Sequence, residues 1–180
     1  LDKVRCPRPN ADLLAKDLEW LGLTWDRGAY LSPDSERYFQ SQRFDIYAEY
    51  FDKLKAQDLI YPCFCSRGQL HAAEAPHLSD GRILYAGTCK NLTASEREDR
   101  AKLRQPAYRL AVNDEPISFV DGNYGKQSYN LIEESGDFIV RRSDGVYAYQ
   151  LAVTVDDALM NVTHVVRGAD LLSSTPIQIY

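Results

Sequence analysis

Residues 147–155 read Tyr-Ala-Tyr-Gln-Leu-Ala-Val-Thr-Val, and this apolar run decides the fold class. A run of this length, with little alternation between apolar and polar residues, is typical of a strand that is buried on both faces. Asp156 and Asp157 follow the run, and we expect them to cap a short helical piece rather than to act as paired catalytic carboxylates. A second strand is predicted at residues 162–167, before a helix that begins near Gly168. Strands and helices in this order indicate an α/β architecture.

In the part of the chain that precedes this run, hydrophobicity repeats with a period of two residues. Apolar and polar side chains alternate in three segments bounded by turn residues: residues 108–112, 117–120 and 138–140. Such segments are typical of antiparallel strands. Another strand is predicted at residues 60–65. We therefore expect a β-rich middle, at about residues 61–136, between two ends that are rich in helix.

Three helices are predicted before the alternating segments. The first lies between the start signal Pro9-Asn10 and the stop signal Gly22. The second extends over residues 41–58 and carries an aromatic stripe that we expect in the core. The third begins with the capping box Thr93-Ala94-Ser95-Glu96 and continues to about Leu103.

The cysteines form an uneven pattern. Cys63 and Cys65 stand at the end of the predicted strand, and Cys89 follows after a long segment rich in Gly, Pro and polar residues. A Cys-x-Cys pair can place two thiolates on one ion, but three thiolates are one ligand short of tetrahedral zinc. The fourth ligand has three candidates: Tyr85, His71 and His77. Chemistry alone favours a histidine. The plainer alternative is that the three cysteines are ordinary buried thiols, and we expect Cys6 to bind no metal.

Composition excludes several classes of function. The 180 residues carry 21 Lys and Arg against 26 Asp and Glu, a net charge of -5. Generic polycation binding to nucleic acid is excluded, and RNA recognition would need a local patch. The chain has no apolar run long enough to span a membrane and no signal peptide, so we expect a cytoplasmic protein without disulfides. It opens with Leu1 and stops at Tyr180 inside an apolar stretch, and we expect both ends to continue in a longer protein.

Long and specific matches to one enzyme family run through nearly the whole chain. Residues 137–170 resemble the class I glutamyl-tRNA synthetases. Four other segments share the resemblance: residues 18–26, 41–43, 61–65 and 171–178. Within the family, residues 147–152 and the Cys-x-Cys…Tyr-x-x-x-Cys cluster are most similar to the branch of glutamyl-Q tRNA(Asp) synthetases, which lack an anticodon-binding domain.

The resemblance implies a fold and a set of metal ligands. The fold is part of a Rossmann-like class I synthetase catalytic domain, an α/β domain into which a zinc-bearing, β-rich module is inserted. Residues 1–60 are the first, helical part of the catalytic domain, residues 61–136 the acceptor-binding module, and residues 137–180 the second part. The implied zinc ligands include tyrosine in place of histidine: Cys63, Cys65, Tyr85 and Cys89.

The resemblance also implies that Tyr149 and Arg167 contact the glutamate substrate. A guanidinium can bind a carboxylate through paired donors, and a phenol adds one oriented hydrogen bond. Arg167 closes a predicted strand before Gly168, at the edge where α/β sheets bind ligands. The alternatives are a core aromatic for Tyr149 and a surface ion pair for Arg167. His164 lies in the same predicted strand, and we expect it to be structural.

The implied activity is ATP-dependent activation of L-glutamate and its transfer to queuosine of tRNA(Asp). Zinc would be bound in the inserted module, and ATP with Mg2+ would be a substrate. The alternative within the family is a discriminating glutamyl-tRNA synthetase that charges tRNA(Glu). A third reading is a non-catalytic module that binds zinc and RNA. The family's HIGH-type and KMSKS-type ATP motifs do not occur in these 180 residues. We therefore assign no catalytic residue, expect this chain alone to be inactive, and expect the parent enzyme to be a monomer.

Overall fold

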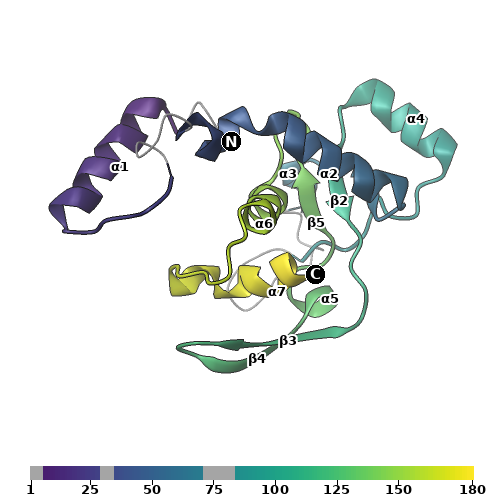
Figure 1. The fold of residues 1–180 in the computed structure, drawn as a ribbon. Coiled ribbons are helices and arrows are strands. Elements are labelled where there is room, and N and C mark those ends of the chain that lie inside the picture. Colours follow the sequence, from purple (N-terminus) through teal and green to yellow (C-terminus); the bar gives the residue numbers. More distant parts are fainter. Residues whose placement is uncertain (1–5, 29–34, 71–83) are drawn as a thin grey trace. The chain divides into compact units, whose positions relative to one another are not determined.

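The computed structural model describes residues 6–28, 35–70 and 84–180 (Figure 1). The chain divides into two compact units, residues 1–49 and 50–180, and the boundary falls within helix α2, Phe44–Ala56. None of the helices in the described residues is long and apolar enough to cross a membrane. The residues of both candidate sites belong to the second unit.

The first unit is helical. It holds α1, Arg8–Trp20, the short 3-10 helices η1, Ser35–Tyr38, and η2, Gln40–Gln42, and the first part of α2. Both helices predicted here are confirmed. α1 ends before Gly22, whose φ of +75° is a conformation that glycine adopts without strain. The aromatic stripe of α2 is buried as predicted, at Tyr47 and, in the second unit, at Phe51.

The second unit contains two antiparallel sheets. Its elements are β1 Ile60–Cys63, α3 Arg67–Leu70, α4 Ala94–Leu103, β2 Ala107–Leu110, β3 Pro116–Asp121, β4 Gly125–Asn130, α5 Leu131–Glu134, β5 Phe138–Arg141, α6 Tyr149–Leu159, η3 Ala169–Ser174 and α7 Thr175–Ile179. One sheet has the order β1-β2-β5, and β3 pairs with β4 in a separate hairpin. In the three-stranded sheet, Cys63 lies opposite Ala107, and Leu110 lies opposite Phe138. The antiparallel strands predicted for the middle of the chain are therefore confirmed.

Aromatic side chains connect α2 to this sheet. Phe51 contacts Tyr108 edge to face, with 5.1 Å between the ring centroids, and its ring lies 6.0 Å from that of Tyr147. Each such pair contributes about 0.5–1.5 kcal/mol beyond the apolar area that it buries. The contacts therefore fix the part of α2 that belongs to the second unit against β2 and the segment after β5.

Helix α4 begins as predicted from its capping box. The Thr93 hydroxyl accepts a hydrogen bond from the Glu96 amide, and the Glu96 carboxylate accepts one from the Thr93 amide at 2.8 Å. Two backbone donors that the helix itself cannot satisfy are thereby paired.

The strand predicted at residues 147–155 is wrong. Helix α6 begins at Tyr149, and Tyr147 alone retains an isolated bridge, to Arg141. The buried side chains of α6 follow helical spacing: Leu151, Ala152, Val155 and Asp156. A continuous apolar run does not by itself distinguish a buried strand from a helix with a wide apolar face. Asp156 and Asp157 consequently lie within the last turns of α6, and the cap predicted for them is wrong as well.

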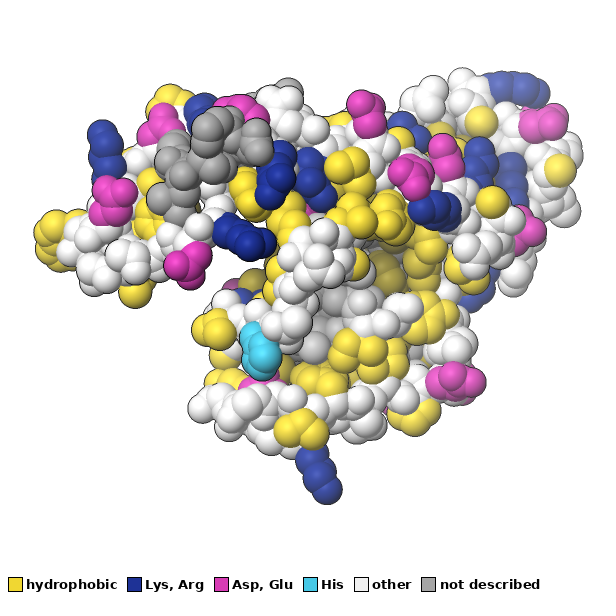
Figure 2. Space-filling view, in the orientation of Figure 1, with side chains coloured by type: hydrophobic (Ala, Val, Ile, Leu, Met, Phe, Trp, Pro, Cys, Tyr) yellow, Lys and Arg dark blue, Asp and Glu magenta, His cyan; other side chains and the backbone are white. Residues whose placement is uncertain are grey.

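The strand predicted at residues 162–167 is also wrong. The segment has no regular secondary structure, and it pairs with no strand in the described part of the chain. Val166 is 99% exposed and His164 is exposed rather than enclosed in a sheet. Hydrophobic side chains are visible at the surface over the C-terminal elements and the β3–β4 hairpin (Figure 2). The helix predicted near Gly168 is confirmed, as η3 followed by α7.

Strand β4 and helix α5 have no counterpart among the predicted elements. β4 is composed largely of polar residues, Gly-Lys-Gln-Ser-Tyr-Asn, so the alternation that marks a half-buried strand is weak. It forms because the turn at Gly125, with φ of +69°, returns the chain alongside β3 over six paired residues. α5 is a single turn capped by the Asn130 side chain.

Candidate metal centre and candidate substrate pocket

Three cysteine thiols converge at the end of β1, and we call them the thiol cluster: Cys63, Cys65 and Cys89. Their sulfur atoms all lie within 4.8 Å of one another, and the sulfurs of Cys65 and Cys89 are 3.6 Å apart. Cys63 and Cys89 are buried and Cys65 is half-buried, and none forms a disulfide. Strand β1 positions the cluster because Cys63 pairs with Ala107 at the end of the ladder, where the chain turns toward Cys65.

Tyr85 places its phenol oxygen beside the cluster. Its Oη is 3.4 Å from Cys63 Sγ and 4.0 Å from Cys65 Sγ, and it accepts a hydrogen bond from the Cys89 amide at 2.9 Å. The Tyr85 backbone forms a parallel bridge with Gly136. A Cβ at Gly136 would lie 2.8 Å from the Tyr85 carbonyl oxygen, so this close approach of two backbones requires glycine.

These four side chains fit the geometry of tetrahedral zinc. With Zn–S bonds of about 2.3 Å and a Zn–O bond of about 2.0 Å, the edges of the tetrahedron are about 3.8 Å between sulfurs and about 3.5 Å between sulfur and oxygen. The separations of 3.6 Å for sulfur to sulfur and of 3.4 and 4.0 Å for sulfur to oxygen are close to those values. A metal ion could therefore bind with little movement of the side chains.

The positive charge around the thiol cluster comes chiefly from a residue that sequence analysis missed. Arg109 is buried, and its Nε donates a hydrogen bond to Cys63 Sγ at 3.3 Å. Nη1 of Arg100 lies 3.9 Å from Cys89 Sγ, and the Phe64 amide donates to that sulfur at 3.4 Å. The sequence does contain a signal for this residue: Arg109 is the single charged residue in the predicted strand Tyr-Arg-Leu-Ala-Val.

The surroundings of Cys63, Cys65 and Tyr85 shift the pKa values of these side chains in different directions. Burial opposes ionisation of Cys63, but its hydrogen bonds with Tyr85 and Arg109 outweigh this effect, so the pKa of this thiol is lowered. Burial and the neighbouring charge of Cys63 raise the pKa of Cys65 to about 12. Burial and the contact with Cys63 raise the pKa of the Tyr85 phenol. Without a metal ion, Cys63 therefore ionises before Cys65 and Tyr85.

His71 and His77, the histidines considered for the fourth position, lie outside the described residues. Cys6 is exposed and belongs to the first unit.

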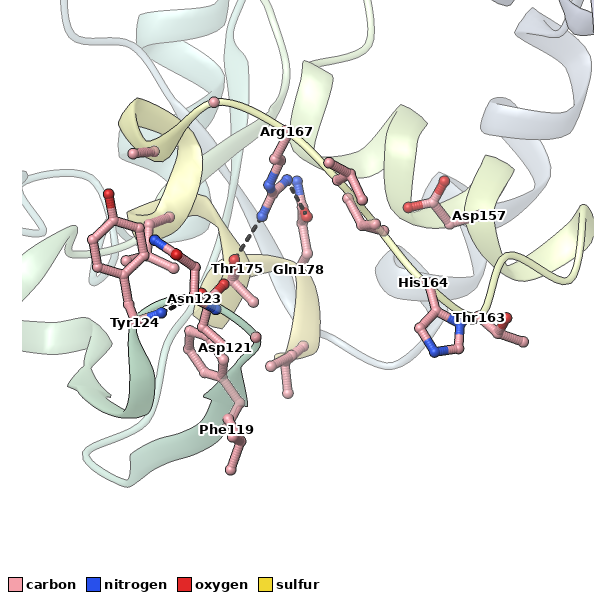
Figure 3. Close-up of a pocket in the computed structure, with 18 of the residues that line it drawn as sticks. Phe119, Asp121, Asn123, Tyr124, Asp157, Thr163, His164, Arg167, Thr175 and Gln178 are labelled. Carbon is pink, nitrogen blue, oxygen red and sulfur yellow. Dashed lines mark hydrogen bonds between the residues drawn. The ribbon is translucent and has the colours of Figure 1, made fainter. Parts of the chain in front are cut away.

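A second candidate site is an open cavity of about 940 Å³ beside the C-terminal elements (Figure 3). The turn of the β3–β4 hairpin, residues 163–169, and helix α7 line it. Arg167 points into its centre, where its Nη2 donates to Thr175 Oγ1 at 2.6 Å and its Nη1 donates to Gln178 Oε1 at 2.8 Å. Gln178 in turn donates to the Gln150 side chain at 3.0 Å, which anchors the arrangement on α6.

The two residues expected to contact glutamate occupy different surroundings. Arg167 lines the cavity, whereas Tyr149, the first residue of α6, is 43% exposed and is not one of the lining residues. Asp157 also lines the cavity. Burial and the neighbouring Asp156 raise its pKa, and the positive charge of Arg167 opposes that rise. The cavity therefore combines a cation with a carboxyl group that gains a proton more readily than usual.

Comparisons with known proteins identify the family. The catalytic domain of the class I tRNA synthetases (E and Q) matches residues 2–180. A glutamyl-Q tRNA(Asp) synthetase of Symbiobacterium thermophilum is 47% identical over 99% of this chain and 56% of its own length. A glutamate–tRNA ligase 2 of Alkalilimnicola ehrlichii is 42% identical over 99% of this chain and 38% of its own length. The chain thus spans 54–56% of the length of three glutamyl-Q tRNA(Asp) synthetases that it matches.

A solved structure supports the same assignment. The crystal structure of a glutamate tRNA ligase from Elizabethkingia meningosepticum, in complex with its amino acid, superimposes with a TM-score of 0.77 at 26% identity. The match covers 99% of this chain and 37% of that one. The α/β class I synthetase catalytic fold expected from the sequence is therefore supported. By its match over residues 2–180, the chain belongs to the catalytic-domain family of the class I tRNA synthetases for E and Q.

Proposed function

We propose that the protein to which this chain belongs activates L-glutamate with ATP and transfers it to queuosine of tRNA(Asp). The observation that carries this proposal is the similarity to several glutamyl-Q tRNA(Asp) synthetases, at 45–47% identity over 99–100% of the chain. ATP, with Mg2+, and tRNA are substrates of the whole enzyme, which we propose acts as a monomer. Residues 61–136 form the acceptor-binding module between the two parts of the catalytic domain.

Arg167 and Tyr149 bind the glutamate in this proposal. Support comes from the contacts of Arg167. Its Nη2 and Nη1 donate to neutral side chains, Thr175 and Gln178, which line the same cavity. A guanidinium fixed in this way is ready to pair with a substrate carboxylate, since less side-chain entropy is lost on binding. Tyr149, half-exposed at the start of α6, supplies a phenol that can donate to the same substrate.

The metal centre consists of Cys63, Cys65, Cys89 and Tyr85, which we propose bind one zinc ion. Support comes from the near-tetrahedral separations of the four ligand atoms and from the burial of Cys63, Cys89 and Tyr85. Zinc held by four protein ligands has no open position, so its contribution is structural. It would hold the end of β1 beside Tyr85 and Cys89.

A second candidate function is the charging of tRNA(Glu). It is favoured by the 42% identity to the Alkalilimnicola glutamate–tRNA ligase 2 and by the fold match to a glutamate tRNA ligase. Both activities share the first step, the activation of glutamate, and differ in the acceptor.

Pyrophosphate exchange by the full-length protein tests the proposal. We expect exchange with glutamate and ATP alone, and no exchange when aspartate replaces glutamate. Exchange that begins only after tRNA(Glu) is added would favour the second candidate. Exchange under no condition would contradict both and would favour a non-catalytic module that binds zinc and RNA.

Transfer of labelled glutamate then identifies the acceptor. We expect labelling of tRNA(Asp) that contains queuosine and none of the same tRNA isolated without this modification. Labelling of tRNA(Glu) at its 3′ end instead would contradict the proposed acceptor while leaving the activation step intact.

A further inference from the structure

Arg109 contacts two of the four side chains of the metal centre. Its Nε donates to Cys63 Sγ at 3.3 Å, and its guanidinium carbon lies 3.7 Å from the centroid of the Tyr85 ring. The side chain is buried, with 6% of the residue exposed. We propose that Arg109 is the positioning residue of the metal centre, which compensates its charge and orients Cys63 and Tyr85. This inference rests on the proposed zinc site.

The charge of the site explains why a buried arginine is needed there. Thiolates that bind a divalent zinc ion are deprotonated, so three of them leave one excess negative charge when the tyrosine is neutral. A buried charge without a partner is strongly unfavourable. Arg109 supplies one positive charge 3.3 Å from Cys63 Sγ, closer than Nη1 of the less buried Arg100, which lies 3.9 Å from Cys89 Sγ. Lys90 is paired with Asp137, with 3.2 Å between Nζ and Oδ2.

The guanidinium is itself held by a second hydrogen bond. Nη1 of Arg109 donates to the main-chain carbonyl of Asp137 at 2.7 Å. The carboxylate of Asp137 is held in turn, because it accepts hydrogen bonds from the Tyr61 hydroxyl at 2.6 Å and from the Val112 amide at 2.8 Å. β2 and the start of β5 therefore set the position of Arg109 before any metal binds.

Three simultaneous contacts distinguish this role from that of a simple positive charge. The planar fork of arginine can donate to a sulfur and a carbonyl while its face covers an aromatic ring. A lysine at this position would retain the charge, but a single ammonium group cannot reproduce the sulfur, carbonyl and ring contacts together. Arginine and lysine are therefore expected to give different metal centres.

Cobalt binding by the full-length protein tests this inference. Co2+ replaces zinc, and its thiolate-to-metal charge-transfer absorption reports the electron density on the bound sulfurs. We expect Arg109→Met to shift this absorption, since the sulfur of Cys63 loses a donor, and to weaken metal binding about 10- to 100-fold. Arg109→Lys should recover part of the affinity but not the wild-type absorption. Competition with a chromophoric chelator measures the affinity.

Arg141→Met is the matched control. Arg141 lies on β5 of the same sheet and is half-buried, with its guanidinium 5.3 Å from the centroid of the Phe51 ring and its Nε donating to the Gly145 carbonyl. We expect this variant to retain both the absorption and the affinity of the wild type. A shift in Arg141→Met as large as that in Arg109→Met would show a general effect of losing a buried arginine and would overturn the inference.

The remaining outcomes separate the two proposals. Failure of the wild-type protein to bind Co2+ or Zn2+ would contradict the metal centre itself. Wild-type binding with an unchanged absorption and affinity in Arg109→Met would overturn only the role of Arg109. Where Arg109→Met does not fold, as judged by circular dichroism, Arg109→Lys decides, and a lysine variant identical to the wild type in both measurements would overturn the inference.

Discussion

The metal centre and the Arg167 cavity differ in how completely the chain encloses their functional groups. At the metal centre, Cys63, Cys89 and Tyr85 are buried. The three cysteine sulfurs lie within 4.8 Å of one another, and Tyr85 Oη is 3.4 Å from Cys63 Sγ. At the cavity, Arg167 is half-buried and its guanidinium donates to two neutral side chains, Thr175 and Gln178. The side chains of a buried cluster are held in place by many mutual contacts, whereas a side chain at an open cavity is held by few. Substitutions should therefore affect folding at the first site and ligand binding at the second.

The largest effect is expected at the centre of the thiol cluster. Cys89→Ser should lower the zinc content from about one equivalent per chain to a small fraction of it, because a neutral hydroxyl is a poor replacement for a thiolate. Metal analysis of protein purified without chelator measures this. Cys6→Ser is the matched control, since Cys6 is exposed and lies outside the second unit. Equal zinc content in both variants would remove Cys89 from the ligand set.

Asp137→Asn should destabilise the same region without removing the metal. The substitution weakens the bonds from Tyr61 and Val112 and the ion pair with Lys90. Because bonds to a charged group contribute about 1.5–3 kcal/mol, we expect a loss of about 3 kcal/mol in the free energy of unfolding. Urea denaturation measures it.

Two further observations sharpen this second prediction. Arg109 bonds to the main-chain carbonyl of Asp137, so the cobalt absorption of Asp137→Asn should remain that of the wild type. Asp144→Asn is the control, since its ion pair with Arg142 is exposed and contributes at most about 1 kcal/mol. A loss of stability no greater than that of the control would contradict the importance of the buried network.

Arg167→Ala should act on binding rather than on folding. Loss of a charge-assisted contact of about 1.5–3 kcal/mol should raise the apparent glutamate constant more than about tenfold and leave the ATP constant nearly unchanged. Pyrophosphate exchange in the full-length enzyme measures both constants. Arg142→Ala, on the exposed turn after β5, is the control. Equal weakening of both substrates by Arg167→Ala would indicate a folding defect and would contradict the comparison between the two sites.

The smallest effect is expected at the exposed cap of α4. Hydrogen bonds from the backbone and side chain of Thr93 hold the pKa of Glu96 below its ordinary value of 4.5. The stability that Glu96 adds to the cap is therefore fully present above pH 4.5 and is lost as the pH falls through the lowered value. Hydrogen exchange of the α4 amides should become faster over that range.

Glu96→Gln should abolish this pH dependence, because an amide does not titrate in that range. Glu98→Gln, in the same helix, should retain it. A pH dependence that persists in Glu96→Gln would show that another group controls the end of the helix.

The capping box, the first two helices, and the strands β1, β2, β3 and β5 could be predicted from the sequence because each has a local signal. Thr93 and Glu96 satisfy backbone donors within four residues, and alternation along a strand reports which face is buried. The convergence of Cys63, Cys65, Tyr85 and Cys89 was likewise predicted, from spacing for the cysteines and from family resemblance for the tyrosine. Their role as zinc ligands stays a prediction.

The C-terminal part could not be predicted in the same way. The apolar pattern of residues 147–155 is compatible with a buried strand and with a helix. The burial of Ala152 and Val155 in α6 favours the helix, and the sequence does not reveal that burial. Residues 162–167 have the composition of a strand, but a strand requires a hydrogen-bonded neighbour, which composition does not reveal. Arg109 was missed because its partners, Cys63 and Asp137, are 46 and 28 positions away in the sequence.

The order of the sheet, β1-β2-β5, has a consequence for how the chain folds. Tyr61 and Asp137 meet across 76 positions of sequence, whereas Ser118 and Ser128 of the β3–β4 hairpin meet across 10. Closing the longer loop costs about 2 kcal/mol more in chain entropy, so the hairpin is expected to form first and the sheet later. Until the sheet forms, the three cysteines remain accessible to oxidants. The speed of sheet formation therefore limits how long newly made chains are exposed to thiol damage.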